Sequence, residues 1–103
     1  MDGTQLTYHI LLVTGDNLFK EGSLPEALSV AQTAIASDSK RFEGYALAAV
    51  IYAKQGQSKQ ADKALAKALE LVPPDKKNQL ADPVAYVQTQ ASLHGAAATP
   101  QAA

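Results

Sequence analysis

Histidine, aspartate and glutamate are the side chains of this sequence that could exchange protons or hold a metal ion. The two histidines, His9 and His94, lie far apart in the sequence and in different predicted helices, so we expect no histidine pair acting as base or ligand. Asp16 and Glu21 lie on one helix and at its end, too far apart in angle for an acid and base pair. Cysteine is absent, which excludes a thiolate ligand or nucleophile. We therefore assign no catalytic, metal-ligating or cofactor-binding residue, and an enzyme or the regulatory domain of one is the rival class of function.

The charge balance argues against nucleic acid or a membrane surface as the partner. The 103 residues include 9 Lys and Arg against 10 Asp and Glu, for a formal net charge of -1. A chain without a basic excess cannot draw affinity from counterion release on a phosphate backbone. No apolar run approaches the ~20 residues of a membrane span, and the chain does not begin with the basic segment and apolar core of a signal peptide. Because cysteine is also absent, we expect a cytoplasmic location.

Two segments of the chain resemble each other at a spacing of 34 residues. Three small residues recur in register: Gly22 with Gly56, Ala27 with Ala61, and Ala34 with Ala68. A period of about 34 residues with two helices per period indicates stacked helix–turn–helix units.

Apolar periodicity predicts five helices, at about residues 4–20, 23–37, 41–55, 59–72 and 83–94. In the fourth, the residues expected to face inward are Ala61, Leu65, Ala68 and Leu69. Asp82 and Pro83 should start the fifth helix after a polar loop at 75–81. Residues 95–103 contain nothing that can pack, so we expect a disordered tail.

Glycines and serines mark the turns between paired helices. Gly22 and Gly56 are expected in the left-handed conformation just past the last turns of the first and third helices. Ser23, with Glu26 three residues later, predicts a capping box for the second helix, and Ser58 is expected to cap the fourth.

The second unit, about residues 42–75, follows a known pattern, with Tyr45-x2-Ala48-Ala49-x2-Tyr52, then Ala61-x3-Leu65, then Ala68 and Pro73. It resembles the tetratricopeptide repeat, whose pattern is W-x2-L-G-x2-Y, A-x3-F, A and P. The first unit, about residues 8–41, matches less well and departs at Thr14, Ala31 and Ser39. The resemblance implies an all-α fold of antiparallel helix–turn–helix repeats in a right-handed solenoid. It also implies one domain over residues 1–94, with the helix at about 83–94 as a C-terminal capping helix.

Small residues are expected where helices meet. Ala27 and Ala61 occupy the positions at which the two helices of a repeat cross, and Gly15 and Ala49 those at which the preceding helix approaches. A larger side chain at such a position would hold the helices apart, at a cost of about 1–3 kcal/mol.

The resemblance further implies a concave groove, lined by the first helix of each repeat, that receives an extended peptide or a helix of a partner protein. Carried over by position, the groove residues are His9, Leu12, Asp16, Phe19, Lys20, Glu43, Ala46, Val50, Ala53 and Lys54. Among these residues, the expected apolar anchors are Leu12, Phe19 and Val50. Asp16 and Glu43 are acidic and would select a partly basic ligand. The alternative is that the fifth helix covers this strip and leaves no groove.

The function that the resemblance implies is a non-catalytic adaptor or scaffold for a protein or peptide partner, with no cofactor, nucleic acid or membrane involved. Some family members bind a C-terminal carboxylate through a Lys/Asn/Arg clamp, but Leu12 and Asp16 stand where its Lys and Asn would be, so we do not expect that mode. Because at least three repeats are normally needed for a stable stack, the alternatives are self-association as a homodimer or a fragment of a longer repeat array.

Overall fold

The part of the chain that the structure describes folds into helices joined by short turns. The computed structural model describes the backbone of residues 3–98 and, within that range, the side chains of residues 6–90 and 92. These residues contain no strand, which confirms the all-α prediction. The elements are α1 (Gly3–Lys20), α2 (Leu24–Ser37), α3 (Phe42–Lys54), α4 (Ser58–Leu71), the 3₁₀ helix η1 (Pro74–Leu80) and α5 (Ala81–Ala98).

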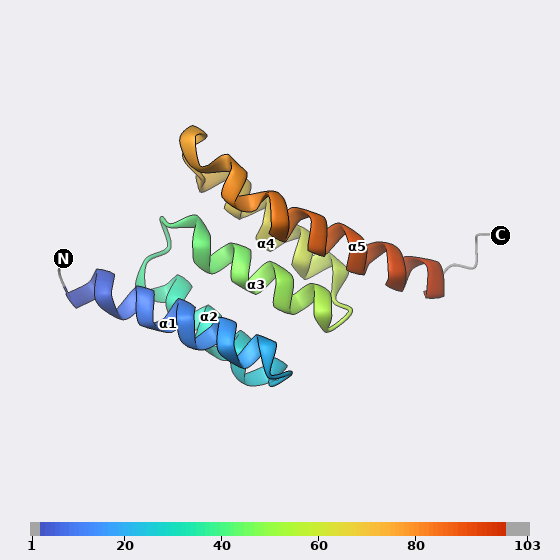
Figure 1. Cartoon of the computed structure of the whole chain (residues 1–103), viewed down its shortest axis with the longest axis horizontal. Helices are drawn as coiled ribbons and strands as arrows, with labels where there is room; N and C mark the ends of the chain where they lie inside the picture. Colours follow the sequence, from blue (N-terminus) through green and yellow to red (C-terminus); the bar gives the residue numbers. More distant parts are fainter. Residues whose placement is uncertain (1–2, 99–103) are drawn as a thin grey trace.

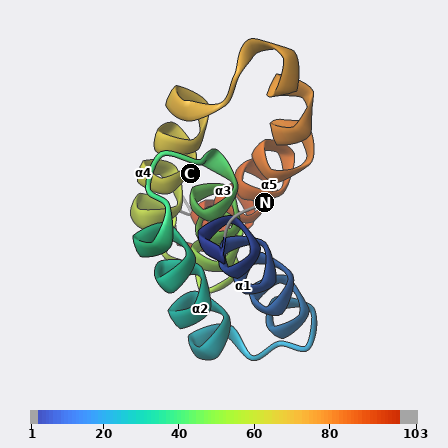
Figure 2. The same ribbon diagram turned by 90° about the vertical axis from the view of Figure 1, so that its left-hand side faces the viewer.

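α3 is the central helix of the molecule. It packs against α1, α2, α4 and α5, and Figure 1 shows it between the α1–α2 pair on one side and α4 and α5 on the other. Seen from the end in Figure 2, α2 and α4 lie to the left of α3, whereas α1 and α5 lie to its right. The molecule measures 54 × 31 × 18 Å, so along its shortest axis it is less than two helix diameters thick.

The sequence of α3 explains its central place. Eight of its 13 residues are buried, on all sides of the helix, as expected for a helix without a continuous polar face. Small residues let its neighbours approach: Ala27, Ala49 and Ala61 have no exposed surface. A Cβ atom placed on Gly15 would lie 2.8 Å from Leu47 Cδ2. The predicted close contacts at these positions are therefore confirmed.

Leu69 is an exception, because 46% of its surface is exposed although it was predicted to face inward. The buried residues of α4 are Ala61, Leu65 and Ala68. Leu69 follows Ala68 by one residue, which turns its side chain by about 100° away from this face.

The two turns that close the helix pairs have the same hydrogen bonds. Gly22 and Gly56 have φ values of 85° and 80°, and the N–H of the next residue, Ser23 or Gln57, donates to the carbonyl five residues back, at 2.9 Å in each turn. This is the predicted glycine-terminated helix end. The predicted serine caps are not made: Ser23 precedes α2 without a side-chain cap bond, and Gln57 rather than Ser58 precedes α4. The turn places the residue after each glycine at the N-cap of the next helix, and in the second turn this residue is Gln57, so that Ser58 is the first residue of α4.

The segment between α4 and α5 differs from the predicted loop. Pro74–Leu80 forms η1, which continues directly into α5 at Ala81 rather than at Pro83. Leu80 explains the difference, because it is buried against Phe42, Ala68 and other core residues and so anchors an otherwise polar stretch.

α5 also runs to Ala98, past the predicted end at about residue 94. Alanine has the highest helix propensity of all residues, and three alanines follow Gly95. The expected tail therefore begins no earlier than residue 99, and residues 99–103 lie outside the described residues.

The packing predicts different effects for two alanines of α4. Ala61 has no exposed surface at a helix crossing, whereas Ala64 is half-buried and lines an open pocket. We expect Ala61→Leu to lower the free energy of unfolding by about 1–3 kcal/mol through overpacking, or about 4–8 °C in Tm per kcal/mol. Ala64→Leu should change it by less than half as much. Equal melting temperatures of the two variants in thermal denaturation would contradict this packing.

Candidate functional site

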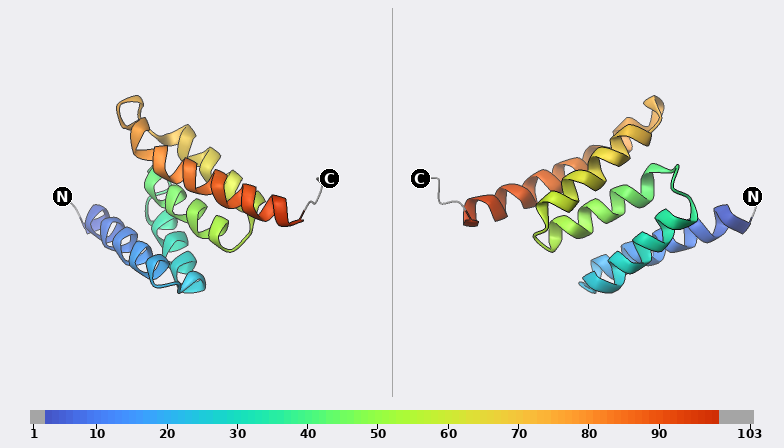
Figure 3. Two further views of the ribbon diagram at one scale, coloured as in Figure 1. Left: turned by 45° about the vertical axis from the view of Figure 1, so that its right-hand side comes forward. Right: turned by 180° about the vertical axis from the view of Figure 1, so that it is seen from behind.

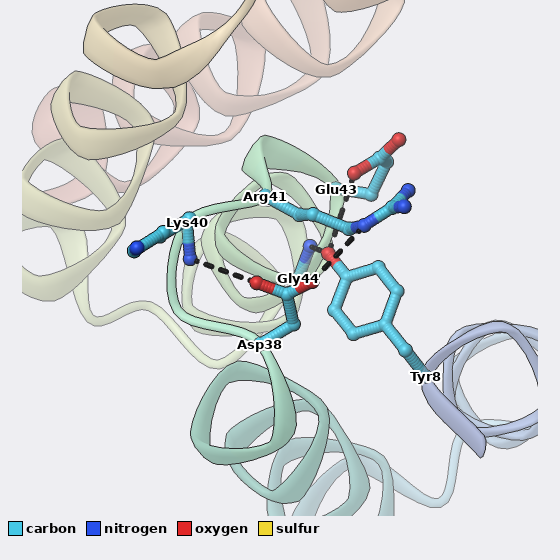
Figure 4. A network of polar contacts seen from close by, with 6 residues as sticks. All are labelled: Tyr8, Asp38, Lys40, Arg41, Glu43 and Gly44. Atoms are coloured by element: carbon cyan, nitrogen blue, oxygen red, sulfur yellow. Dashed lines mark hydrogen bonds and ion pairs between the residues drawn. The ribbon is translucent and has the colours of Figure 1, made fainter. Parts of the chain in front are cut away.

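A buried hydrogen bond joins α1 to the first turn of α3 (Figure 4). The backbone N–H of Gly44 donates to Tyr8 Oη at 2.8 Å, and only 2% of the surface of Tyr8 is exposed. Gly44 is the third residue of α3, whose start has no side-chain cap of its own. The first N–H groups of a helix lack partners inside the helix. The hydroxyl of Tyr8 therefore caps α3 from a neighbouring helix.

Charged residues surround this hydroxyl. Tyr8 Oη donates in turn to Glu43 Oε1 at 3.3 Å, and the Arg41 guanidinium lies 5.6 Å from the centroid of the Tyr8 ring, within the range of a cation–π contact. Arg41 Nε donates to Asp38 Oδ2 at 3.1 Å, and the Lys40 N–H donates to Asp38 Oδ1 at 3.2 Å. These contacts, drawn in Figure 4, hold the connection between α2 and α3 beside α1.

Burial raises the pKa of the Tyr8 hydroxyl well above its usual range. The hydrogen bond from the Gly44 N–H lowers this pKa, whereas the negative charge of Glu43 raises it further. The hydroxyl therefore stays protonated, and can donate to Glu43 while it accepts from Gly44.

Gly44 has a packing role in the same junction. A Cβ atom at this position would lie 3.0 Å from Ile35 Cγ1 and 3.4 Å from Tyr8 Oη. The absence of a side chain lets α1 and α2 approach the start of α3 from both sides. The junction thereby sets the position of α1 relative to α3.

An open pocket lies between α1, α3 and α5, on the side where Figure 3 (left) shows α3 between the other two helices. Its volume is about 340 Å³. The lining comprises six apolar residues and two aspartates: Phe19, Ala46, Leu47, Val50, Pro83, Tyr86, Asp16 and Asp82. We call this pocket the groove.

An aromatic pair connects the two walls of the groove. The rings of Phe19, in the last turn of α1, and Tyr86, on α5, meet edge to face with centroids 5.8 Å apart and planes at 76°. This geometry is favourable for aromatic rings. Burial also raises the pKa of Tyr86. The pair holds α5 against the end of α1, although the two helices are far apart in the sequence.

Two carboxylates stand at the groove, one on each wall. Asp16 pairs with Lys20 one turn later, with Lys20 Nζ 3.0 Å from Asp16 Oδ2, and both side chains are largely exposed. Such a pair contributes little to stability, so Asp16 can exchange Lys20 for another cation at small cost. Asp82 lies in the first turn of α5, where the helix dipole favours a negative charge.

Four of the ten groove residues predicted from the sequence line this pocket: Asp16, Phe19, Ala46 and Val50. His9, Lys20 and Lys54 are exposed outside it, and Leu12 packs half-buried against the core. Glu43 belongs instead to the Tyr8 junction.

α5 covers part of the strip of residues that was predicted to line the groove. Ala53 is buried with Ala61 and Val87, beneath α5, and Ala46 keeps only 8% of its surface exposed. Val50 stays half-buried at the pocket. α5 thus forms one wall of the groove rather than closing it.

The groove residues on α5 were not among those predicted from the sequence. Asp82 and Pro83 were predicted only to start the fifth helix. Tyr86 lies four residues after Asp82, on nearly the same face of a helix, and this spacing was the available signal. Which face meets the groove depends on the path of η1, which the sequence pattern did not reveal.

A second pocket, of about 280 Å³, lies between α2, α3 and α4. Tyr45 and Tyr52, two positions of the repeat pattern, line it. Both are half-buried, and Tyr52 Oη accepts a hydrogen bond from Gln32 Nε2 at 3.4 Å. Lys63 and Lys67 stand at this pocket, so its charge is opposite to that of the groove.

Within the described part of the chain, no three His, Cys, Asp or Glu side chains come together as a metal site would require. The side chain of His94 lies outside the described residues. No helix among those described has both the length and the apolar character needed to cross a membrane.

Comparison of the chain with models of protein families, with curated proteins and with solved structures finds no match.

The junction predicts that Tyr8→Phe destabilises the protein at neutral pH. The variant keeps the ring but removes the acceptor of the buried Gly44 N–H, and leaving such a group unpaired costs about 1–3 kcal/mol. Tyr52→Phe is the matched control, because it removes only the exposed 3.4 Å bond from Gln32. Urea denaturation at pH 7 measures both. Equal midpoints for the two variants would show that the Tyr8 hydroxyl does not cap α3.

The raised pKa of Tyr8 predicts loss of stability in alkali. The unfolded chain releases the tyrosine proton near pH 10, whereas the folded protein retains it at that pH. The free energy of unfolding contributed by this group is therefore fully present below about pH 10 and declines as the pH rises further. In denaturation curves from pH 8 to pH 11, Tyr8→Phe should show a shallower decline than the wild type. Parallel declines would contradict the assignment.

Proposed function

We propose that this protein is a tetratricopeptide-like recognition module, which binds a peptide or a helix of a partner protein without catalysing a reaction. Support comes from two successive helix pairs with equivalent glycine turns at Gly22 and Gly56, and from α5 covering part of α3 as a capping helix does. On this proposal the pairs are two repeats of a right-handed solenoid, and the protein acts as a cytoplasmic adaptor.

The observation that carries the proposal is the groove between α1, α3 and α5. It is an open pocket of about 340 Å³ with an apolar floor that includes Leu47 and Val50. Ligand sites are typically concave and mainly apolar, with a few polar groups that fix orientation. Because its floor belongs to the central helix and its walls to two helices that pack on it, the groove exists before a ligand arrives, which lowers the entropic cost of binding.

Charge defines the class of ligand that the groove prefers. Asp16 and Asp82 line it, and no basic residue does so among the described residues. Complementary charge favours the correct partner and disfavours like-charged ones. We therefore propose a ligand segment that places a large apolar side chain on the floor and a Lys or Arg beside the two aspartates.

Selection from a library of random peptides displayed on phage tests the proposal. The wild-type chain should retain peptides that combine a large apolar residue with Lys or Arg. Val50→Glu should retain none of them, because it places a charge in the floor of the groove. Leu69→Glu is the matched control, since it makes the same kind of change at an exposed position of α4. Circular dichroism first confirms that both variants fold.

Retention of the same peptides by Val50→Glu would contradict a site in the groove, and a wild-type chain that enriches none would contradict peptide binding.

The acidic rim can be tested separately with a peptide that the wild type retains. Asp82→Lys should weaken its binding by a factor on the order of 3–10, because the substitution replaces an attraction to Lys or Arg by a repulsion. Asp75→Lys, at an exposed position of η1, makes the same charge change outside the groove and should have a smaller effect. Isothermal titration calorimetry measures both. Equal losses would mean that the net charge of the chain, and not the rim, governs binding.

A further inference from the structure

The outer face of α1 carries an apolar stripe, which consists of Leu6, Ile10 and Val13. Their exposed fractions are 51%, 54% and 47%. Spacings of four and three residues place them on one face of the helix. Of the other described residues, Leu69 is the one large apolar side chain of comparable exposure, and it stands alone on α4. A contiguous exposed apolar face is a usual mark of an interaction surface, whereas single exposed residues are ordinary.

The stripe points away from the rest of the molecule and from the groove. α1 packs on α2 and α3 through its opposite face, where Tyr8 and Gly15 are buried. Figure 1 shows α1 at one side of the molecule and α5 at the other, with α3 between them. The side chains that α1 contributes to the groove, Asp16 and Phe19, lie on a different part of its circumference. A partner on the stripe would therefore leave the groove open.

Charge narrows the kind of partner that the stripe can take. Residues 3–15 include no Asp, Glu, Lys or Arg, and the first charged residue after the stripe is Asp16. The stripe thus offers nothing to select an acidic or a basic partner. A contact of the stripe with its own copy, in contrast, brings no like charges together, which is the usual obstacle to a symmetric interface.

The spacing of the stripe is also self-complementary. A two-fold axis at Ile10, with the two helices antiparallel, brings Ile10 of the two copies together and sets Leu6 of each beside Val13 of the other. The same arrangement opposes the two helix dipoles favourably. Alternating spacings of four and three residues are those of helices that pack along a seam.

We propose that the protein forms a symmetric homodimer through the Leu6, Ile10 and Val13 stripe of α1. Three half-exposed side chains per copy make a small apolar centre compared with the ~800 Å² per partner of standard interfaces. The dimer is therefore weak and dissociates on dilution.

Sedimentation velocity of the full chain from about 1 µM to about 1 mM tests the dimer. The wild-type mass should rise with concentration from that of one chain toward that of two. Ile10→Lys and Val13→Lys, which place a charge in the stripe at half-exposed positions, should remain monomeric over the whole range. Leu69→Lys, the control, should behave as the wild type does. Circular dichroism checks the fold of each variant.

Three results would overturn the proposal: a wild-type chain that stays monomeric throughout, equal shifts in the stripe variants and the Leu69→Lys control, or growth beyond the mass of two chains.

Cross-linking tests the position of the axis. The chain contains no cysteine, so Ile10→Cys provides a single thiol. A short bis-maleimide should join two copies of Ile10→Cys efficiently, and the added substitution Val13→Lys should abolish this product. Leu69→Cys should give only the slow product of random collision. Equal yields from Ile10→Cys and Leu69→Cys would place the contact elsewhere and reject the two-fold arrangement.

Discussion

The hydrogen bond from the Gly44 N–H to the Tyr8 hydroxyl fixes where α1 meets the first turn of α3. Its partners are buried, so neither has water as a ready substitute, and an unpaired N–H at that point would be costly. The Arg41 guanidinium beside the Tyr8 ring and the bare Cα of Gly44 belong to the same contact. Because α1 and α3 supply one wall and the floor of the groove, its shape depends on this junction.

The small residues at the helix crossings and the long α5 complete the arrangement. Ala27, Ala49 and Ala61 let each helix pair close tightly. α5 packs on the side of α3 that the two pairs leave uncovered. The Phe19–Tyr86 contact then ties α5 to the end of α1. As a result, α1 has two surfaces with different properties: one wall of an acidic groove, and an uncharged apolar stripe on the outside. A dimer formed through the stripe would present two grooves, and a partner with two binding segments would gain affinity from their linkage.

Much of the fold follows from local sequence patterns. The repeated glycines and alanines identify the helix pairs and their turns, because a left-handed helix end favours glycine and a tight helix crossing requires a small side chain. The path from α4 to α5 could not be predicted, since it depends on the burial of Leu80 against residues distant in the sequence. The capping role of Tyr8 could not be predicted either, because no local sequence pattern indicates which backbone N–H a tyrosine hydroxyl will bind. Phe19 and Val50, two of the residues predicted to form a groove, line the pocket between α1, α3 and α5, whereas its α5 wall around Tyr86 was not predicted.

The most direct test of the account is a map of amide chemical-shift changes in the isotope-labelled chain on addition of a peptide that the wild type retains. If the groove is the preformed binding surface, the largest changes will come from Phe19, Val50 and Tyr86, and the helices will keep their free-state shifts elsewhere. Changes centred on Tyr45 and Lys63, at the pocket on the opposite side of α3, would contradict the account, as would changes spread over all helices.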